Sequence, residues 1–443
     1  MKKRFLTLAL ATFMATGALA GCGNSGTQSS GAANSAGGAT QSTATESKDT
    51  EAAAGTAGTD AVQNLINNTS GTVDLTVWAS EDDQDFTQKV INEFTAQYPE
   101  VNFNITLGAE SESTAKDTVL ADVEAAADVF AFAHDQINDL VNAGALQEVV
   151  SYYTYDVAAE NVAGSVEAAT VNGKLYAYPM TADNGYFMFY DKSVITDPSS
   201  LEKMIEDAKA ANKKIAIEFS NSWYLYGFFR ANGLEASLNE DGKTNSCNWN
   251  AAGGTDVAQA ILDAVATGVV VNMDDGTTVT GIADGTVCAA INGIWNAQAA
   301  QAAWGDNYMA AKLPTIKIGG QDKQIYSYSG FKLIGVNQHS KQIGWSILLA
   351  EYLTNEQNQL ARYEARGLGP ANIKAAATDK VKNDLAVAAL AAQAEYSTPQ
   401  VIGGNYWDPA NTLGKVLAGG NPDGTDLQTL LDTAVEGITA PAN

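Results

Sequence analysis

Residues 73–78 read Val-Asp-Leu-Thr-Val-Trp, an apolar run that predicts a β-strand and opens the part of the chain that decides the fold. Residues 85–98 place apolar side chains at helical spacing, and residues 101–107 alternate apolar and polar side chains as a second strand would. A helix over 114–127 is expected to lead into a third strand at 128–132. This βαβαβ order predicts an α/β fold with mostly parallel sheets and ligands at the carboxyl ends of the strands.

The same alternation continues along the chain, and 443 residues are enough for two domains. After the N-terminal segment there is no run of about 20 apolar residues that could span a membrane. Further strands are expected at 215–219, 288–291 and 331–336, and further helices at 344–354 and 379–396.

The first 21 residues are typical of a lipoprotein signal peptide. Three basic residues at 2–4 precede an apolar segment, 5–19, that is too short for a mature transmembrane helix. The run Leu-Ala-Gly-Cys ending at Cys22 resembles a bacterial lipobox, whose cysteine receives a lipid and becomes the new N-terminus. The alternative is an ordinary secretion signal that ends near a cysteine. We expect an exported protein held on the outer face of the cell membrane by lipid on Cys22.

A flexible tether is expected over 22–70. Residues 23–59 contain no aromatic and no branched aliphatic residue, so they cannot bury enough apolar surface to offset the entropy of ordering. About 37 such residues would reach roughly 35 Å from the membrane.

The charge of the chain excludes a nucleic-acid binder. It carries 25 basic and 51 acidic residues, a net charge of −26, and lacks a basic stripe that could displace counterions from phosphates. The charge is interpreted as a contribution to solubility.

Motifs of an enzyme, a metal site or a cofactor site are not found. The two histidines, His134 and His339, lie far apart and without a nucleophile context. Residues 274–276 and 421–424 resemble calcium-loop fragments but lack the full spacing, and are interpreted as turns. Cys247 and Cys288 could form a disulfide, a question that the sequence leaves open.

From Leu75 onward the chain resembles the extracellular solute-binding proteins of ABC importers, in particular the maltose/maltodextrin-binding branch. Matching motifs occur in the family's order over about 350 residues. They are Trp78 with the acidic loop 81–83, and the segments 128–135, 172–179, 189–192, 290–295, 313–315, 369–372 and 406–409.

The resemblance implies a two-lobed clamp that closes on its ligand about a hinge. Lobe 1 would hold 72–183 plus 329–378, and lobe 2 would hold 184–328 plus 379–443. The implied function is capture of an oligosaccharide, first of all maltose or maltodextrin, and delivery to the membrane permease subunits of an ABC importer. Such a protein would act as a monomer without a cofactor, and would catalyse no reaction.

Aromatic rings are expected to line the cleft, because the apolar faces of a pyranose stack on flat rings. Trp295 and Trp407 align with stacking tryptophans of the family. Trp223 stands where the family has a stacking tyrosine, and Phe132 stands where the family usually has tryptophan. The aromatic candidates are Trp295, Trp407, Phe132, Tyr406 and one of Trp223, Tyr224 and Tyr226.

Carboxylates are expected to accept hydrogen bonds from the sugar hydroxyls. Asp135 follows a strand and is the leading candidate, with a helix N-cap as the alternative role. Gln136 stands where the family has arginine, and Asp83 where it has lysine. The other polar candidates are one or two of Glu81, Asp82 and Asp83, either Asp183 or Asn184, and Glu112.

These departures leave a second ligand class open, another neutral oligosaccharide or a polyol bound by the same clamp. An exported glycoside hydrolase is the alternative from another class, since 51 acidic residues guarantee chance pairs of carboxylates.

Overall fold

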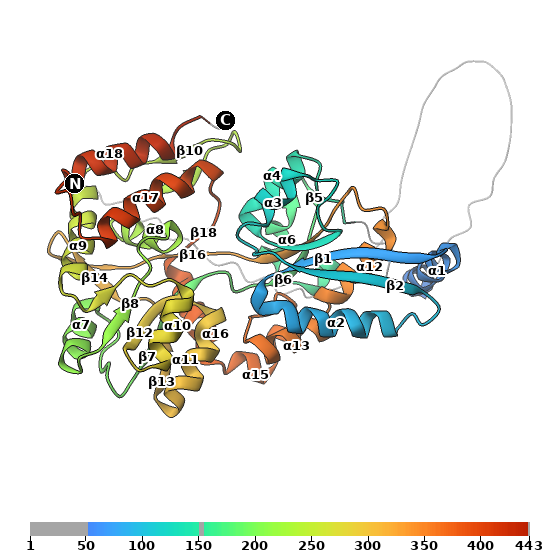
Figure 1. The fold of residues 1–443 in the computed structure, drawn as a ribbon, viewed down its shortest axis with the longest axis horizontal. Helices are drawn as coiled ribbons and strands as arrows, with labels where there is room; N and C mark the ends of the chain where they lie inside the picture. The colour runs from blue at the N-terminus through green and yellow to red at the C-terminus, as the bar shows by residue number, and fades with distance from the viewer. Residues whose placement is uncertain (1–51, 150–154, 442–443) are drawn as a thin grey trace, which may run out of the picture. The chain divides into compact units, whose positions relative to one another are not determined.

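The computed structural model describes residues 52–149 and 155–441, which belong to one compact unit, Glu51–Asn443 (Figure 1). The predicted signal peptide and Cys22 lie outside the described residues. Two five-stranded sheets form the framework of the part that is described.

The first sheet has the strand order β2-β1-β3-β17-β6. β1 is parallel to both β2 and β3, whereas β17 is antiparallel to β3 and to β6. Four strands therefore point one way and β17 runs against them. The bounds are β1 (Thr72–Ala79), β2 (Asn102–Ala109), β3 (Val129–Ala133), β17 (Lys332–Val336) and β6 (Tyr178–Thr181).

The second sheet repeats this pattern in the order β11-β8-β12-β7-β13. β8 is parallel to β11 and β12, and β7 is antiparallel to β12 and β13. Both sheets are thus mostly parallel, as the βαβαβ order predicts, with one reversed strand each. The bounds are β11 (Val270–Val271), β8 (Lys214–Ala216), β12 (Val287–Gly293), β7 (Tyr186–Asp191) and β13 (Tyr308–Ala311).

Helices and short hairpins complete the fold. The helices of the described residues are α1 (Ala52–Asn68), α2 (Gln84–Ala96), α3 (Ala115–Ala121), α4 (Ile137–Asn142), α5 (Val157–Glu160), α6 (Ala163–Ala168), α7 (Leu201–Ala210), α8 (Ser222–Ala231), α9 (Gly254–Ala266), α10 (Asp275–Ala283), α11 (Ala297–Trp304), α12 (Ile343–Thr354), α13 (Glu356–Arg366), α14 (Ile373–Ala376), α15 (Asp379–Lys382), α16 (Leu385–Gln393), α17 (Trp407–Ala418) and α18 (Leu427–Ile438). The short strand pairs are β4 (Thr170–Val171) with β5 (Lys174–Leu175), β9 (Ala236–Leu238) with β10 (Asn245–Cys247), β14 (Thr315–Ile318) with β15 (Gln321–Gln324), and β16 (Ser327–Ser329) with β18 (Ser397–Pro399).

Each sheet has its own apolar core. α2 and α12 cover the first sheet, where the rings of Phe94 and Trp345 meet edge to face at 6.5 Å. The larger core of the second half gathers α8, α9, α17 and α18, and Phe229 stacks on the buried Trp249 at 4.1 Å. Separate cores allow each half to keep its shape as a rigid body.

Three expected elements are shorter than the sequence predicts. The helix expected over 114–127 ends at Ala121, because Asp122 turns to an extended conformation and accepts from the following amides. The helix expected over 379–396 is broken where Asp384 caps α16. The strand expected over 215–219 ends at Ala216.

The prediction of a flexible tether over 22–70 is wrong for its second part, because α1 occupies Ala52–Asn68. Its apolar residues Val62, Leu65 and Ile66 pack against the core of the first sheet. The indole N–H of Trp345 also donates to Thr69 Oγ1 at 2.9 Å. These apolar residues follow the polar run at helical spacing, and they supply the buried surface that the run itself lacks.

The two cysteines that could have formed a disulfide are both free thiols. Cys288 lies buried on β12 and Cys247 lies partly buried on β10. Burial raises the pKa of Cys247 to about 11 and that of Cys288 to about 12, so both stay protonated at neutral pH.

Glu351 is a buried carboxyl on α12, with only 7% of its surface exposed. Desolvation raises its pKa to about 8. The unfolded value is about 4.3, so the folded state holds a proton that the unfolded state releases. Stability is therefore expected to fall as the pH rises from about 4.3 to about 8.

Glu351→Gln removes this ionisation and is expected to raise the melting temperature at pH 8.5 by about 2–5 °C relative to the parent. At pH 5 the two proteins should melt within about 1 °C of each other, because the parent carboxyl is then neutral. Calorimetric melting at both pH values tests this. The control Glu167→Gln changes an exposed carboxyl and should show no such pH-dependent gain. Equal melting of Glu351→Gln and parent at pH 8.5 would contradict the account.

Candidate functional site

A cavity of about 650 Å³ receives residues from both halves of the unit. Its lining includes residues that follow β1, β2 and β3 in the first sheet, and residues that follow β8 and β12 in the second. These are the carboxyl ends of parallel strands, where the sequence pattern places a ligand site.

Three tryptophans line the cavity. Trp223 lies in the first turn of α8, Trp295 follows β12, and Trp407 begins α17. The rings of Trp223 and Trp295 lie 5.7 Å apart at 37°, so they form one continuous aromatic wall. Flat apolar surfaces of this kind suit the C–H face of a ring-shaped ligand.

Both indole N–H groups of this wall are held by hydrogen bonds. Trp295 Nε1 donates to Asp275 Oδ2 at 3.0 Å, and Trp223 Nε1 donates to Gln400 Oε1 at 2.7 Å. Asn292 Nδ2 donates to the other oxygen of Asp275 at 2.8 Å. These bonds fix the ring positions before any ligand arrives.

The ring of Trp295 packs against the backbone of Gly293. A Cβ at this position would lie 2.1–2.2 Å from three atoms of the six-membered ring, closer than any real contact. The benzo ring therefore lies flat against the backbone of Gly293, and only its opposite face is open. A glycine is needed here because the backbone must approach an aromatic face this closely.

Two carboxyls of the cavity have strongly raised pKa values. Burial raises the pKa of Asp135 to about 7, although the Gln400 side chain and the charge of Lys116 oppose this. Burial likewise raises the pKa of Glu218 to about 7, with the carboxylate of Asp275 adding to the effect. Asp135 Oδ1 is buried without a hydrogen-bond partner among the described residues. An unsatisfied acceptor in a cavity wall is suited to a ligand donor.

The alternative role of Asp135 as a helix N-cap is not observed. The turn at His134–Gln136 and the helix α4 that follows have no side-chain cap bond. The Asp135 carboxyl is thus left for the cavity.

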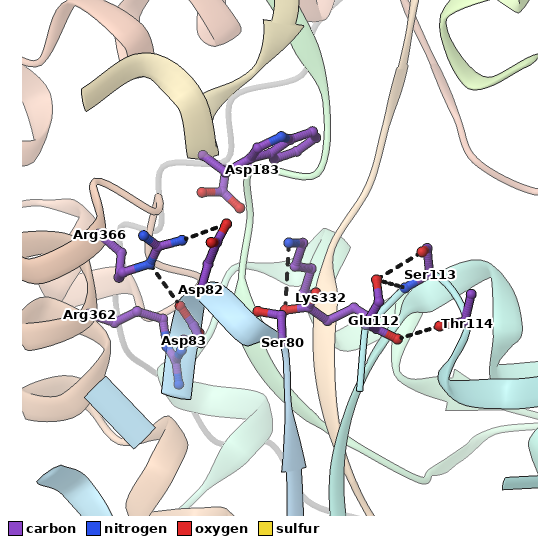
Figure 2. A network of polar contacts seen from close by, with 12 residues as sticks. Ser80, Asp82, Asp83, Glu112, Ser113, Thr114, Asp183, Lys332, Arg362 and Arg366 are labelled. Atoms are coloured by element: carbon purple, nitrogen blue, oxygen red, sulfur yellow. Dashed lines mark hydrogen bonds and ion pairs between the residues drawn. The ribbon is translucent and has the colours of Figure 1, made fainter. Parts of the chain in front are cut away.

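A network of acids and bases forms the floor on the side of the first sheet (Figure 2). Asp83 is buried between Arg362 and Arg366, with Arg366 Nε at 3.0 Å from its Oδ1. Arg366 also lies 3.4 Å from Asp82 Oδ2. Lys332 Nζ lies 3.7 Å from Glu112 Oε1. Asp83 is therefore a structural counterion, although it forms part of the lining.

The cavity lining contains most of the binding-site residues that the sequence predicts. Those in its lining are Asp82, Asp83, Glu112, Asp135, Asn184, Trp223, Tyr224, Trp295 and Trp407. Five predicted residues, Glu81, Phe132, Asp183, Tyr226 and Tyr406, are not among them.

The three aromatic candidates outside the lining are buried in cores, where Tyr226 stacks on Tyr328 at 4.0 Å. Phe132 is fully buried beside Phe130, and Tyr406 is fully buried with its hydroxyl donating to the Ser222 carbonyl at 2.9 Å. None of these rings can stack on a ligand in this arrangement, so all three assignments are corrected to core positions.

The two polar candidates, Asp183 and Glu81, also lie outside the cavity lining. Asp183 is buried and accepts a hydrogen bond from the backbone N–H of Gly369, which ties the segment after β6 to the segment after α13. Glu81 is exposed in the turn after β1. At each of these two positions it is the neighbour, Asn184 or Asp82, that lines the cavity.

Sequence reasoning missed several residues of the lining, among them Glu218, Asp275, Lys332, Arg366 and Gln400. Each lies outside the quoted family motifs. Position gives a signal for one of them, since Glu218 lies near the carboxyl end of the strand that the sequence predicts over 215–219.

Gln136 replaces the family's arginine and has a structural role. Its amide donates to the carbonyls of Glu112 and Ser113 at 2.7 and 3.0 Å, and its oxygen accepts from the Lys116 N–H at 2.9 Å. The residue thereby ties the turn after β3 to the loop after β2.

Residues 52–149 and 155–441 contain no group of three His, Cys, Asp or Glu residues arranged to hold a metal. Over the same residues, no helix combines the length and apolar character needed to cross a membrane. Burial lowers the pKa of His134 to about 4, and its Nδ1 accepts from the Phe331 N–H at 3.3 Å, as in a structural histidine.

The family model described as "Bacterial extracellular solute-binding protein" matches residues 89–389, more than half of the chain. The chain belongs to the bacterial extracellular solute-binding proteins. Membership confirms the resemblance drawn from the motifs, and proteins of this family act outside the cytoplasm.

Relatives of this solute-binding protein include a galactooligosaccharide-binding protein of Bacillus subtilis (strain 168), 28% identical over 330 residues that cover 70% of this chain and 75% of the relative. A solved structure with acarbose is 30% identical, with a TM-score of 0.73, covering 83% of this chain and 99% of the other. A maltodextrin-binding protein from L. casei BL23 is 26% identical, with a TM-score of 0.68, covering 84% and 100%. The two-lobed α/β fold is that of these solved proteins.

Proposed function

We propose that this solute-binding protein captures an oligosaccharide, with maltodextrin as the first candidate, by closing its two lobes around it. The observation that supports this is the aromatic wall of Trp223 and Trp295, beside carboxyls that have no cationic partner in the described residues. Rings suit the apolar faces of a sugar, and carboxyls suit its hydroxyls. The names of the relatives point to the same ligand class.

The expected binding energy is adequate for capture. Three stacked rings contribute about 0.5–1.5 kcal/mol each beyond area burial. Each hydrogen bond to a charged group contributes about 1.5–3 kcal/mol. Three or four such bonds together with the rings contribute about 6–16 kcal/mol, a range that spans the roughly 8 kcal/mol of micromolar affinity and in its upper part leaves a margin against ordering costs.

A galacto-oligosaccharide is the second candidate ligand. It is favoured by the relative from Bacillus subtilis, which is named for that sugar class. Asp83 and Gln136 stand where the family has basic residues, so two charged donors of the family's pattern are absent here.

Delivery would occur at a membrane permease pair of an ABC importer, which couples uptake to ATP hydrolysis in the cytoplasm. The protein itself would catalyse no reaction and would act as a monomer. For the lobes we retain 72–183 plus 329–378 and 184–328 plus 379–443 as the proposed boundaries, with the hinge at the crossings. The proposed anchor is a lipid on Cys22, with residues 23–51 between the anchor and α1.

Trp295→Ala and Trp407→Ala are each expected to weaken oligosaccharide binding at least tenfold, because each removes a stacking surface. Isothermal calorimetry against malto-, galacto-, gluco-, xylo- and fructo-oligosaccharides identifies the ligand and measures both effects. Trp304→Ala, a tryptophan on α11 outside the cavity, is the control and should bind like the parent. The proposal would be contradicted if both variants bound as tightly as the parent, or if the parent bound no sugar of the panel.

Binding is expected to strengthen as the pH rises from 6 to 8. The carboxylate form of Asp135 is the better acceptor, and a pKa of about 7 means that it forms across this window. One such group changes affinity by up to about tenfold. Asp135→Asn should match the parent at pH 6, bind more weakly at pH 8, and show a flatter pH profile.

The matched control for this profile is Asp60→Asn, which changes an exposed carboxyl on α1. It should retain the full pH dependence of the parent. A profile for Asp135→Asn as steep as that of the parent would remove Asp135 from the site.

Cys22→Ser is expected to release the protein from the membrane fraction of a bacterium that expresses the full chain. The serine hydroxyl cannot receive the thioether-linked lipid, so incorporation of labelled fatty acid should also be lost. Cys247→Ser is the control and should remain in the membrane fraction. A membrane-bound, unlabelled Cys22→Ser protein would argue for another mode of attachment.

A further inference from the structure

Lys332 is the first residue of β17, the reversed strand of the first sheet. Because β17 runs against its neighbours, its amino end lies at the edge where the other strands have their carboxyl ends. Lys332 therefore enters the cavity, and only 13% of its side chain is exposed.

The surroundings keep this lysine charged. Desolvation alone would lower its pKa, but Glu112, Asp183 and Asp83 together outweigh desolvation and the repulsion of Arg362, and the pKa of Lys332 is raised. Figure 2 shows Lys332 beside Glu112, whose Oε1 lies 3.7 Å from the ammonium. At this distance the two groups form an ion pair, but they are too far apart for a good hydrogen bond.

The ammonium also lies over the ring of Trp295, 5.2 Å from its centroid. Gly293 covers one face of the benzo ring, so the ammonium lies on the side that is open to a ligand. A sugar unit that stacks on this face would have to pack beside the Lys332 ammonium, within reach of its N–H groups. Neither the ion pair nor the contact with the ring uses all three N–H donors.

The neighbouring donors of the cavity are wholly or partly engaged. The indole N–H groups of Trp223 and Trp295 donate to Gln400 and Asp275. Lys116 is paired with Asp139 at 3.2 Å, and Arg366 with Asp82 and Asp83. Lys116 and Arg366 also keep unused N–H donors, but of the three cations in the described lining Lys332 is the one that lies over a ring of the aromatic wall.

We propose that Lys332 is a further ligand-binding residue, which donates a hydrogen bond to the ring or glycosidic oxygen of the sugar unit stacked on Trp295. Those oxygens carry no hydrogen and can only accept, so the ionised carboxylates of the cavity cannot donate to them, whereas the Lys332 ammonium can. Lys332 would therefore fix the orientation of that sugar unit, and the inference rests on the proposed function of oligosaccharide capture.

A double-mutant cycle tests this with maltotriose and a galactotriose as probes, both titrated by calorimetry at pH 7.5. Lys332→Met and Trp295→Ala should each weaken binding at least tenfold. Their combination should weaken it less than the product of the two effects, by at least about threefold, because both residues act on one sugar unit. Lys374→Met, an exposed lysine on α14, is the control and should bind like the parent.

A charge-neutral variant, Glu112→Gln with Lys332→Met, separates a ligand donor from a mere counterion. If Lys332 only neutralises Glu112, removal of both charges restores the parent affinity, and this result would overturn the inference. If Lys332 contacts the sugar, binding stays weak. Thermal melting checks that each variant is folded.

The outcomes also separate this inference from the proposed function. Binding of a probe by the parent with an unchanged Lys332→Met affinity would overturn the role of Lys332 alone. Failure of the parent to bind any oligosaccharide of the calorimetric panel would overturn both.

Discussion

The position of the Trp295 ring is the constraint on which the site depends. The indole is held by a hydrogen bond to Asp275, by the backbone of Gly293 beneath it and by Trp223 at its side. Each contact comes from a different part of the second half of the molecule. A ring held in this way loses little entropy when a ligand stacks on it, so more of the stacking energy remains as affinity.

The charges of the cavity divide into two groups with different consequences. Asp83 and Glu112 face cations, and these pairs stabilise the loops that form the floor. Asp135 and Glu218 have no such partner, and burial raises the pKa of each to about 7. Unpaired buried carboxyls cost stability, so their retention in a cavity wall indicates a function rather than a role in folding.

The sequence predicts the fold and nine of the 29 residues that line the cavity, and physical reasons explain why the others are missed. Phe132 and Tyr406 lie next to residues that do face the site, but side-chain direction depends on a register that motif matching does not reveal. Asp275 and Gln400 reach the cavity only because distant segments fold together. Lys332 could not be placed without knowing that β17 is reversed, since its residues alone indicate a strand but not its direction.

The sign of the cavity's charge bears on what it can bind. Its described lining holds eight carboxyl side chains and only Lys116, Lys332 and Arg366 as cations. The chain as a whole carries a net charge of −26, so the long-range field adds to the local one. An anionic sugar would face repulsion on approach and unpaired carboxylates after binding, whereas the hydroxyls of a neutral sugar supply donors to them. A neutral oligosaccharide is the ligand that satisfies both the rings and the acids of this wall.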